Sequence, residues 1–312
     1  MTTEMTSRRS EIPPSASTVS VSIIDTTASV RGLPANTYLD PSIPGHDYLA
    51  VPCFPFIIHH PTVNKTLLFD LGIRKYWQNL SPPLVEDIKG EGMQIYVEKD
   101  VPQILSEGGI DPTTVDAVFW SHYHFDHIGN MSLFLPSTTL IVGPGFKDKM
   151  LPGFPTDPDS DILETDYHNR PLKELDFHSH PLTIGNFPAI DYFSDGSFYI
   201  LNAPGHTVGH ICALARVTSN PNSFILMGAD AANHGGELRP SPHLPFPKTI
   251  SPHPFQPSLP TPCPGHIFTH LLQNDTQPFY KAPLDAHHDD QLYAETKEKV
   301  QGMDGVDNVL VV

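Results

Sequence analysis

Residues 121–130 read Ser-His-Tyr-His-Phe-Asp-His-Ile-Gly-Asn, and they hold the densest group of ligand-type side chains singled out in the sequence. It places three imidazoles and one carboxylate within six positions, at His122, His124, Asp126 and His127. Neutral imidazole and carboxylate are the ligands that Zn²⁺ and similar divalent ions prefer. Four such side chains are too many for one ion that must also keep a water, so the spacing predicts two neighbouring ions.

The metal motif is expected on a loop at the end of a buried strand. Residues 116–120 are apolar, with β-branched and aromatic side chains, which is typical of a strand inside a sheet. Positions two apart in an extended chain share a face, so His122 and His124 can hold one ion. Asp126 and His127 follow where the chain turns toward a helix, and they can face the second ion. The chain has 18 histidines, so isolated ones carry little weight, whereas a cluster directly after a strand does.

The bulk composition limits the class of protein. The 312 residues carry a formal net charge of −17, which argues against nucleic acid and anionic membranes as partners. No apolar stretch of about 18 residues occurs, so no membrane span is expected. Residues 1–17 are predicted to be a disordered tail, rich in Ser, Thr, Pro and Glu and unlike a secretory signal. The expected partner is a small-molecule substrate; the oligomeric state stays open, with a dimer possible.

Cysteine usage favours a reducing compartment. Cys53, Cys212 and Cys263 are far apart, odd in number and form no CxxC pair. This pattern fits neither a disulfide framework nor a cysteine zinc site. Reduced thiols in a cytoplasmic protein are therefore expected.

Short strands are predicted along the whole chain, with helical stretches between them. The predicted strands, besides the one before the metal motif, cover residues 19–24, 51–59, 66–72, 139–142, 190–193, 198–201, 211–217, 224–228 and 309–312. Residues 73–109 indicate two helical pieces, and residues 290–301 one helix. Residues 31–47 are expected to be a loop, which could lie over the site. Residues 144–181 are expected to form an insertion or long loop.

Three more polar segments follow predicted strands. Asp70 ends a strand in an Asp-x-Gly pattern, where a turn or helix-cap aspartate is the alternative to a site residue. His206 and His210 both lie on the loop after residues 198–201, and spacing alone does not choose between them as ligands. Asp230 follows an apolar strand in a Gly-x-Asp pattern, with an ordinary turn as the alternative.

The sequence His122-Tyr-His124-Phe-Asp126-His127 matches the HxHxDH motif of the metallo-β-lactamase superfamily. It resembles most the branch of N-acyl homoserine lactonases, glyoxalase II and related thioesterases, and the wider sequence is similar to fungal lactonase- or lactamase-type hydrolases. The resemblance implies an α/β fold, the four-layered αβ/βα sandwich, with two mixed β-sheets flanked by helices. It favours one catalytic domain at residues 18–312. A Pro-rich insertion at residues 236–265 is expected to wall the substrate pocket, a peptide-module ligand being the alternative.

The resemblance also implies a complete ligand set. It assigns His122, His124 and His206 to the first ion, Asp126, His127 and His288 to the second, and Asp230 to both. Asp70 would support a ligand histidine from outside the ligand set. His287 competes with His288, and His210 is implied to be structural. The implied cofactor is two Zn²⁺ ions, although another divalent metal is possible.

The sequence departs from this branch after the bridging aspartate. Lactonases of this type commonly carry a tyrosine three residues later, near the substrate carbonyl, whereas this chain has Asn233 followed by His234. Either could hydrogen-bond a carbonyl or an oxyanion. We expect a dinuclear-metal hydrolase that opens a lactone, with Asp126 moving the proton and Asn233 or His234 as carbonyl donor. The alternatives are a γ-lactam or cyclic carbamate hydrolase, a thioesterase of the glyoxalase II type, and a structural zinc protein without turnover.

Overall fold

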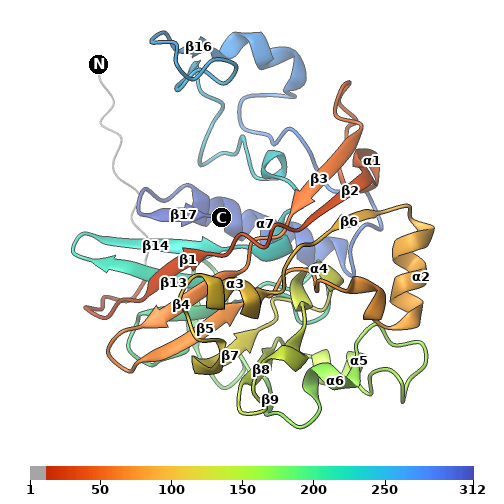
Figure 1. The fold of residues 1–312 in the computed structure, drawn as a ribbon. Coiled ribbons are helices and arrows are strands. Elements are labelled where there is room, and N and C mark those ends of the chain that lie inside the picture. The colour runs from red at the N-terminus through yellow and green to blue at the C-terminus, as the bar shows by residue number, and fades with distance from the viewer. Residues whose placement is uncertain (1–11) are drawn as a thin grey trace.

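Two mixed β-sheets lie face to face with helices on their outer sides, as the computed structural model, which describes residues 12–312, shows (Figure 1). The first sheet has the order β1 (Ser20–Ile23), β4 (Phe56–His60), β5 (Lys65–Phe69), β7 (Val115–Phe119), β8 (Thr139–Val142) and β9 (Leu172–Glu174). The second has the order β10 (Leu182–Ile184), β11 (Phe187–Asp191), β12 (Phe198–Asn202), β13 (Ile211–Ser219), β14 (Asn222–Met227) and β17 (Val309–Val311). This is the four-layered sandwich that the sequence predicted.

Strand direction determines where the helices lie. β5, β7, β8 and β9 are parallel neighbours, and parallel strands need crossover connections, which carry helices over the outer face. The helices of this half are α2 (Pro82–Gly90), α3 (Val101–Glu107), α4 (Phe125–Ile128), α5 (Phe146–Met150) and α6 (Glu164–Tyr167). The second sheet is antiparallel apart from the β14–β17 pair, and α7 (Asp290–Asp304) packs on its outer face.

Three apolar clusters hold the layers together. In β7, Val118 packs toward the helices, whereas Ala117 and Phe119 pack toward the second sheet, because successive side chains of a strand point to opposite faces. Both faces of β7 are buried, which explains the continuous apolar run that identified this strand in the sequence. On the far side, Val300 and Met303 of α7 join the outer cluster of the second sheet.

A small third sheet stands beside the first. It consists of β3 (Tyr48–Pro52), β2 (Ser29–Pro34) and β6 (Gln94–Tyr96), and the one-turn helix α1 (Ala35–Tyr38) follows β2. The prediction of a loop at residues 31–47 is therefore wrong in part. The predicted strand at residues 51–59 is two strands, β3 and β4, in different sheets, with Pro55 between them, where a proline cannot donate to a ladder.

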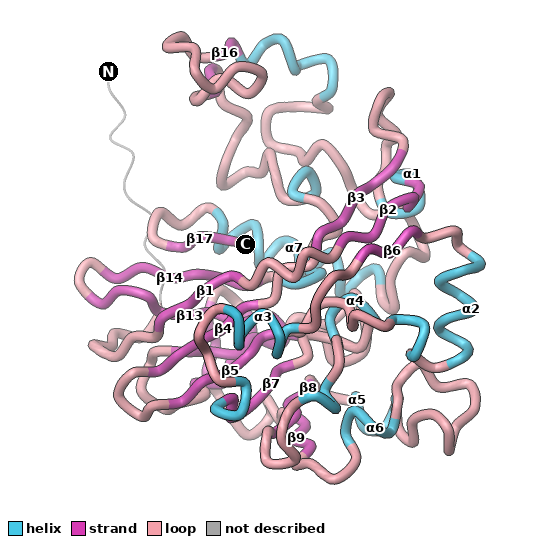
Figure 2. The backbone as a smooth tube through the Cα atoms, viewed as in Figure 1, coloured by secondary structure: helices cyan, strands magenta, loops and turns pink. Residues whose placement is uncertain are grey.

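The Pro-rich segment lies away from the two large sheets (Figures 1 and 2). It is mostly loop, with one two-residue strand pair, β15 (Thr249–Ile250) and β16 (Cys263–Pro264). Prolines lack the N–H that a ladder needs, which explains the irregular backbone.

Residues 1–11, most of the predicted tail, lie outside the described part of the chain. Residues 12–17, which were predicted to belong to that tail, contact the second sheet: Ile12 is buried, and the Arg216 guanidinium donates to the Pro13 carbonyl. All three cysteines are buried and unpaired. No helix within residues 12–312 has both the length and the apolarity to cross a bilayer.

Candidate metal centre

Four strand ends bring polar side chains to one edge of the sandwich. β5 leads into Asp70, β7 into His122, β12 into the loop of His206, and β14 into Asp230. The two sheets thus contribute equally to this edge. The sequence could place each residue after a strand, and the fold brings the strand ends together.

Three imidazole nitrogens converge there. His122 Nε2 lies 3.0 Å from His124 Nδ1, and His124 Nδ1 lies 3.1 Å from His206 Nε2. Burial lowers the pKa of all three rings, those of His122 and His206 well below the usual value for histidine, which keeps the rings neutral. Neutral rings offer lone pairs, and lone pairs this close repel one another unless a cation lies between them. The donor set therefore fits a divalent metal ion.

Asp230 adds a carboxylate to the three imidazoles. Its Oδ2 lies 3.4 Å from His206 Nε2 and 3.9 Å from His122 Nε2. The ligand atoms of His122, His124, His206 and Asp230 all lie within 4.8 Å of one another. The other oxygen, Oδ1, lies 3.1 Å from His127 Nε2, so the carboxylate faces two groups of ligands at once.

Asp126 and His127, on the one-turn helix α4, form the second group. Asp126 Oδ2 lies 3.7 Å from His127 Nε2. Burial alone would lower the pKa of His127, but the charges of Asp230, Asp126 and Asp70 outweigh it and hold the pKa well above the usual value. Without metal, a protonated His127 therefore offsets the carboxylates around it. The donors here, an imidazole and carboxylates, are of the types that divalent ions bind.

The structure does not bring His288 to this centre. Its side chain is exposed, whereas His287 lines the cavity and has its Nδ1 3.1 Å from His206 Nδ1. The His287 ring stacks on Tyr293 with centroids 3.6 Å apart. The backbone explains this difference. The His288 N–H donates to the His206 carbonyl, and the Asp289 side chain caps α7. These two contacts fix the backbone so that the His287 side chain points inward. His287, with a buried and unpartnered Nε2 in the described chain, is the better candidate of the two.

His210, the spacing rival of His206, lies behind the centre. It is fully buried, and its Nδ1 is 2.8 Å from the Ala203 carbonyl oxygen. Its ring centroid is 5.3 Å from that of His122. His210 does not belong to the group of ligand atoms formed by His122, His124, His206 and Asp230. Burial lowers the pKa of His210 to about 4, so it packs as a neutral ring.

Asp70 holds the metal loop from beneath. Its carboxylate accepts from the Ser121 N–H at 2.7 Å, from the Ser121 hydroxyl at 2.8 Å and from His127 Nδ1 at 2.8 Å. The residue has a φ of 64°, a left-handed conformation that costs on the order of 1 kcal/mol outside glycine. Asp70 therefore fixes the tautomer that leaves His127 Nε2 free to face the centre. Ser121 belongs to the motif but was not predicted as a site residue.

Replacing Asp70 by asparagine is expected to weaken metal binding by about 10- to 100-fold, since three donors would then face an amide that has only one acceptor oxygen. Metal titration of the variant would measure the loss. Asp116→Asn is the matched control, because Asp116 lies at the other end of β7. Equal affinities of Asp70→Asn and the parent protein would contradict the supporting role.

The metal loop closes on a second buried contact. Gly129, with a φ of 48°, follows α4, and a Cβ there would lie 2.4 Å from the Cβ of Leu71. The Arg74 side chain donates from Nε to the Gly129 carbonyl at 2.9 Å and from Nη2 to Asp166 at 2.7 Å. This close approach explains why a glycine ends the motif.

A cavity of about 540 Å³ opens onto the centre. Its walls come from the small third sheet and α2, for example Val30, Leu33 and Ile88, and its floor from the two ligand groups. No residue between 236 and 265 lines it, so the prediction that the Pro-rich segment walls the pocket is wrong. The wall comes instead from α2 and from the small sheet, part of which was predicted as a loop that could lie over the site.

The two candidate carbonyl donors are placed differently. Asn233 lines the cavity, but its Nδ2 is buried and has no partner in the described structure. His234 lies outside the cavity: its Nδ1 accepts from the Gly236 N–H, and its ring packs against His46 and Tyr280. His234 therefore caps a turn and does not reach the centre.

Tyr38 is a cavity residue that the sequence did not reveal. It ends α1, lines the cavity, is partly buried, and its hydroxyl makes no hydrogen bond within residues 12–312. Burial raises the pKa of Tyr38, and the charges of Glu91, Asp126 and Asp230 raise it further, so the hydroxyl keeps its proton. No motif marks Tyr38, because it reaches the site only through the pairing of β2 in the small sheet.

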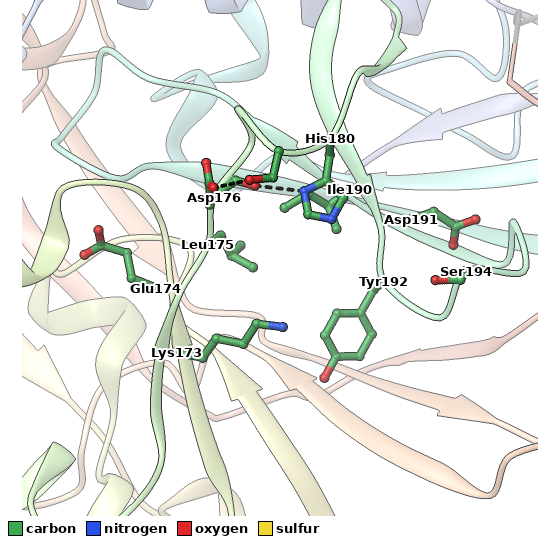
Figure 3. A pocket seen from close by; sticks show the side chains of 10 residues that line it. Lys173, Glu174, Leu175, Asp176, His180, Ile190, Asp191, Tyr192 and Ser194 are labelled. Atoms are coloured by element: carbon green, nitrogen blue, oxygen red, sulfur yellow. Dashed lines mark hydrogen bonds between the residues drawn. The ribbon is translucent and has the colours of Figure 1, made fainter.

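A second cavity, of about 380 Å³, lies between β9 and β11 (Figure 3). Lys173 and Tyr192 face it, and His180, on its rim, has its Nδ1 2.9 Å from the Asp176 carbonyl oxygen. None of the predicted ligands or catalytic residues lines it. The chemistry therefore belongs to the first cavity.

Comparison with known families and proteins gives a consistent result. Residues 51–218 match the family model described as the metallo-beta-lactamase superfamily. Gamma-lactamase FDB1 of Fusarium pseudograminearum is 43% identical, over 96% of this chain and 75% of its own length. Gamma-lactamase MBL2 of Gibberella moniliformis is 48% identical, over 69% of this chain and 90% of its own.

Solved structures share the fold. An N-acyl homoserine lactone hydrolase superposes with a TM-score of 0.59 at 13% identity, covering 98% of this chain and 92% of its own. AidC, a dizinc quorum-quenching lactonase, superposes with a TM-score of 0.54 at 12% identity, covering 97% and 90%. At these identities the likeness concerns the fold alone.

Proposed function

Because the chain belongs to the metallo-β-lactamase superfamily and is a metal-dependent hydrolase of the lactamase or lactonase type, we propose that it opens a γ-lactam with two divalent ions, Zn²⁺ by preference. Two relatives above 40% identity carry the name gamma-lactamase, which favours the lactam over the lactone first expected. The lactone stays the second candidate, because the lactonases share the fold. The convergence of three neutral imidazoles and Asp230 carries the proposal.

The reaction is a hydrolysis. The oxygen of water bonds to the carbonyl carbon, the bond from that carbon to the ring nitrogen breaks, and the nitrogen takes a proton, so the product is an amino acid with an open chain. When bound, the ions supply a water whose pKa falls from 15.7 toward about 7 and polarise the carbonyl.

The chain holds and orients these components. His122, His124 and His206 would hold the first ion, Asp126 and His127 the second, and Asp230 both. A carboxylate at this place can accept a proton from the attacking water and return it. Asp126 lines the cavity, so we assign it the transfer of a proton from the attacking water to the leaving nitrogen.

We assign the hydrogen bond to the substrate carbonyl to Tyr38. Its free, protonated hydroxyl is open to the cavity and within electrostatic reach of Asp126 and Asp230. Asn233 is the rival, but its buried Nδ2 would first have to be uncovered. A donor aimed at a developing oxyanion stabilises the transition state more than the ground state.

Tyr38→Phe is expected to lower kcat by about 10- to 100-fold, the cost of one hydrogen bond to a charged group, with an unchanged metal content. KM should change less than kcat, because the bond strengthens in the transition state. Tyr48→Phe, at an exposed position of the same small sheet, is the control. An unchanged kcat in Tyr38→Phe would return the role to Asn233.

A substrate panel tests the function itself. Metal-loaded protein would be given matched γ-lactams, cyclic carbamates, lactones and thioesters, with ring opening followed by acid release and thiol release. We expect the lactams or carbamates to be opened with the highest kcat/KM, and metal-free protein to be inactive. Preference for thioesters, or metal binding with no turnover of any compound, would contradict the proposal.

A further inference from the structure

We propose that the cavity selects its substrate by charge, taking uncharged or cationic acyl compounds and excluding anionic ones. The selecting groups are two carboxylates at its mouth, Asp87 and Glu91. This inference rests on the proposed hydrolytic function and goes beyond it, because the metal centre does not decide the charge of the substrate.

Helix α2 presents both carboxylates to the cavity. Leu84, Asp87, Ile88 and the C-cap Glu91 all line it. Their spacing of i, i+3, i+4 and i+7 is that of a single helix face, the face that normally carries only apolar side chains toward the interior. Ile88 is buried, whereas Asp87 and Glu91 are exposed. The face of α2 that lines the cavity therefore carries two exposed carboxylates, Asp87 and Glu91, at the mouth of the cavity.

The positions of Asp87 and Glu91 are electrostatically unfavourable for the stability of the fold. The carboxyl end of a helix is the negative end of its dipole, so Asp87 and Glu91 are repelled there. Neither forms an ion pair with another residue of the described chain. Burial raises the pKa of nearby Asp161, and the charge of Asp87 raises it further. Asp87 and Glu91 thus lower stability without forming a compensating ion pair, which is expected of residues kept for function.

The charge balance of the cavity is negative even with metal bound. Its lining, as far as residues 12–312 show, contains no lysine or arginine and five carboxylates, those of Asp70, Asp87, Glu91, Asp126 and Asp230. Two divalent ions would bring only four positive charges, and they would lie at the floor, beside the three aspartates of the centre. The mouth therefore keeps the charges of Asp87 and Glu91, and a like-charged substrate must pass them.

The apolar part of the cavity lining sets a second requirement for the substrate. The apolar wall that includes Val30, Leu33 and Met93 suits a substrate with an apolar body. The inferred substrate is thus an apolar, uncharged or cationic cyclic acyl compound.

The test compares three γ-lactams that share one apolar body and end in a methyl, a trimethylammonium or a carboxylate group. In the metal-loaded protein at low salt, kcat/KM for the carboxylate compound should be about tenfold or more below that of the methyl compound. The double substitution Asp87→Asn and Glu91→Gln should remove most of that difference. High salt should also reduce the difference in kcat/KM between the carboxylate and methyl compounds, because it screens the charges.

Glu86→Gln is the matched control, because Glu86 is exposed on the same helix and does not line the cavity. Equal kcat/KM for the three compounds, or the same change in Glu86→Gln as in the double variant, would overturn the inference. Calorimetric binding of the three compounds separates this inference from the proposed function. If the anionic compound binds more weakly but none of the three compounds is hydrolysed, only the proposed hydrolytic function is contradicted. If the compounds are hydrolysed without a preference for charge, only this inference is contradicted.

Discussion

Replacing His124 by alanine is expected to abolish both metal uptake and hydrolysis. His124 Nδ1 lies between His122 Nε2 and His206 Nε2, at 3.0 and 3.1 Å, so its loss opens the middle of the ligand set. Activity should fall to that of metal-free protein, a larger loss than the about 10- to 100-fold expected when only a supporting contact is removed. Metal analysis of the purified variant and the lactam assay would measure both effects.

A matched pair of controls accompanies this substitution. His288→Ala should change neither metal content nor activity, because the side chain is exposed and outside the cavity. His287→Ala should weaken metal binding, since His287 contacts His206 and lines the cavity. Retained metal and turnover in His124→Ala would refute the centre described above, and a loss confined to His288→Ala would restore the assignment made from the sequence.

Replacing Asp166 by alanine is expected to lower the free energy of unfolding by about 3–5 kcal/mol, because it leaves a buried cation unpaired. Asp166 is fully buried and Arg74 is 5% exposed, and their side chains meet at 2.7 Å. Burial raises the pKa of Asp166 although Arg74 opposes it, so the pair itself adds little. The loss comes from the Arg74 guanidinium, which also holds the Gly129 carbonyl of the metal loop.

Urea unfolding of the metal-free protein would measure this change. Glu107→Ala is the control, because its ion pair with Lys99 is exposed and should matter little. Replacing the pair together, Asp166→Leu with Arg74→Met, should recover much of the stability, since no buried charge remains. Similar unfolding free energies for Asp166→Ala and Glu107→Ala would contradict this explanation.

The sandwich and the position of the polar residues at its strand ends could be predicted from the sequence because both depend on local patterns. β8 was predicted at its observed bounds, Thr139–Val142, since both faces of this strand are buried and its apolar run is continuous. The segment His122 to His127 holds four ligand-type residues within six positions, and Asp70 and Asp230 each follow an apolar strand. Where residues close in the sequence carry the information, the prediction agrees with the structure.

The parts that could not be predicted depend on contacts between distant segments. β6 has only three residues, too few for a period, and exists because β2 pairs with it. Tyr38 reaches the cavity through the same small sheet. The choice between His287 and His288 depends on a backbone hydrogen bond to His206, 82 residues away from His288, which no pattern of neighbouring residues reveals.

The central claim is that His122, His124, His206, Asp126, His127 and Asp230 together bind a pair of divalent ions. Titration of metal-free protein with Zn²⁺, followed by calorimetry, tests it most directly. We predict uptake of about two ions per chain, lost in His124→Ala. A single tightly held ion, or uptake that His124→Ala leaves unchanged, would contradict it.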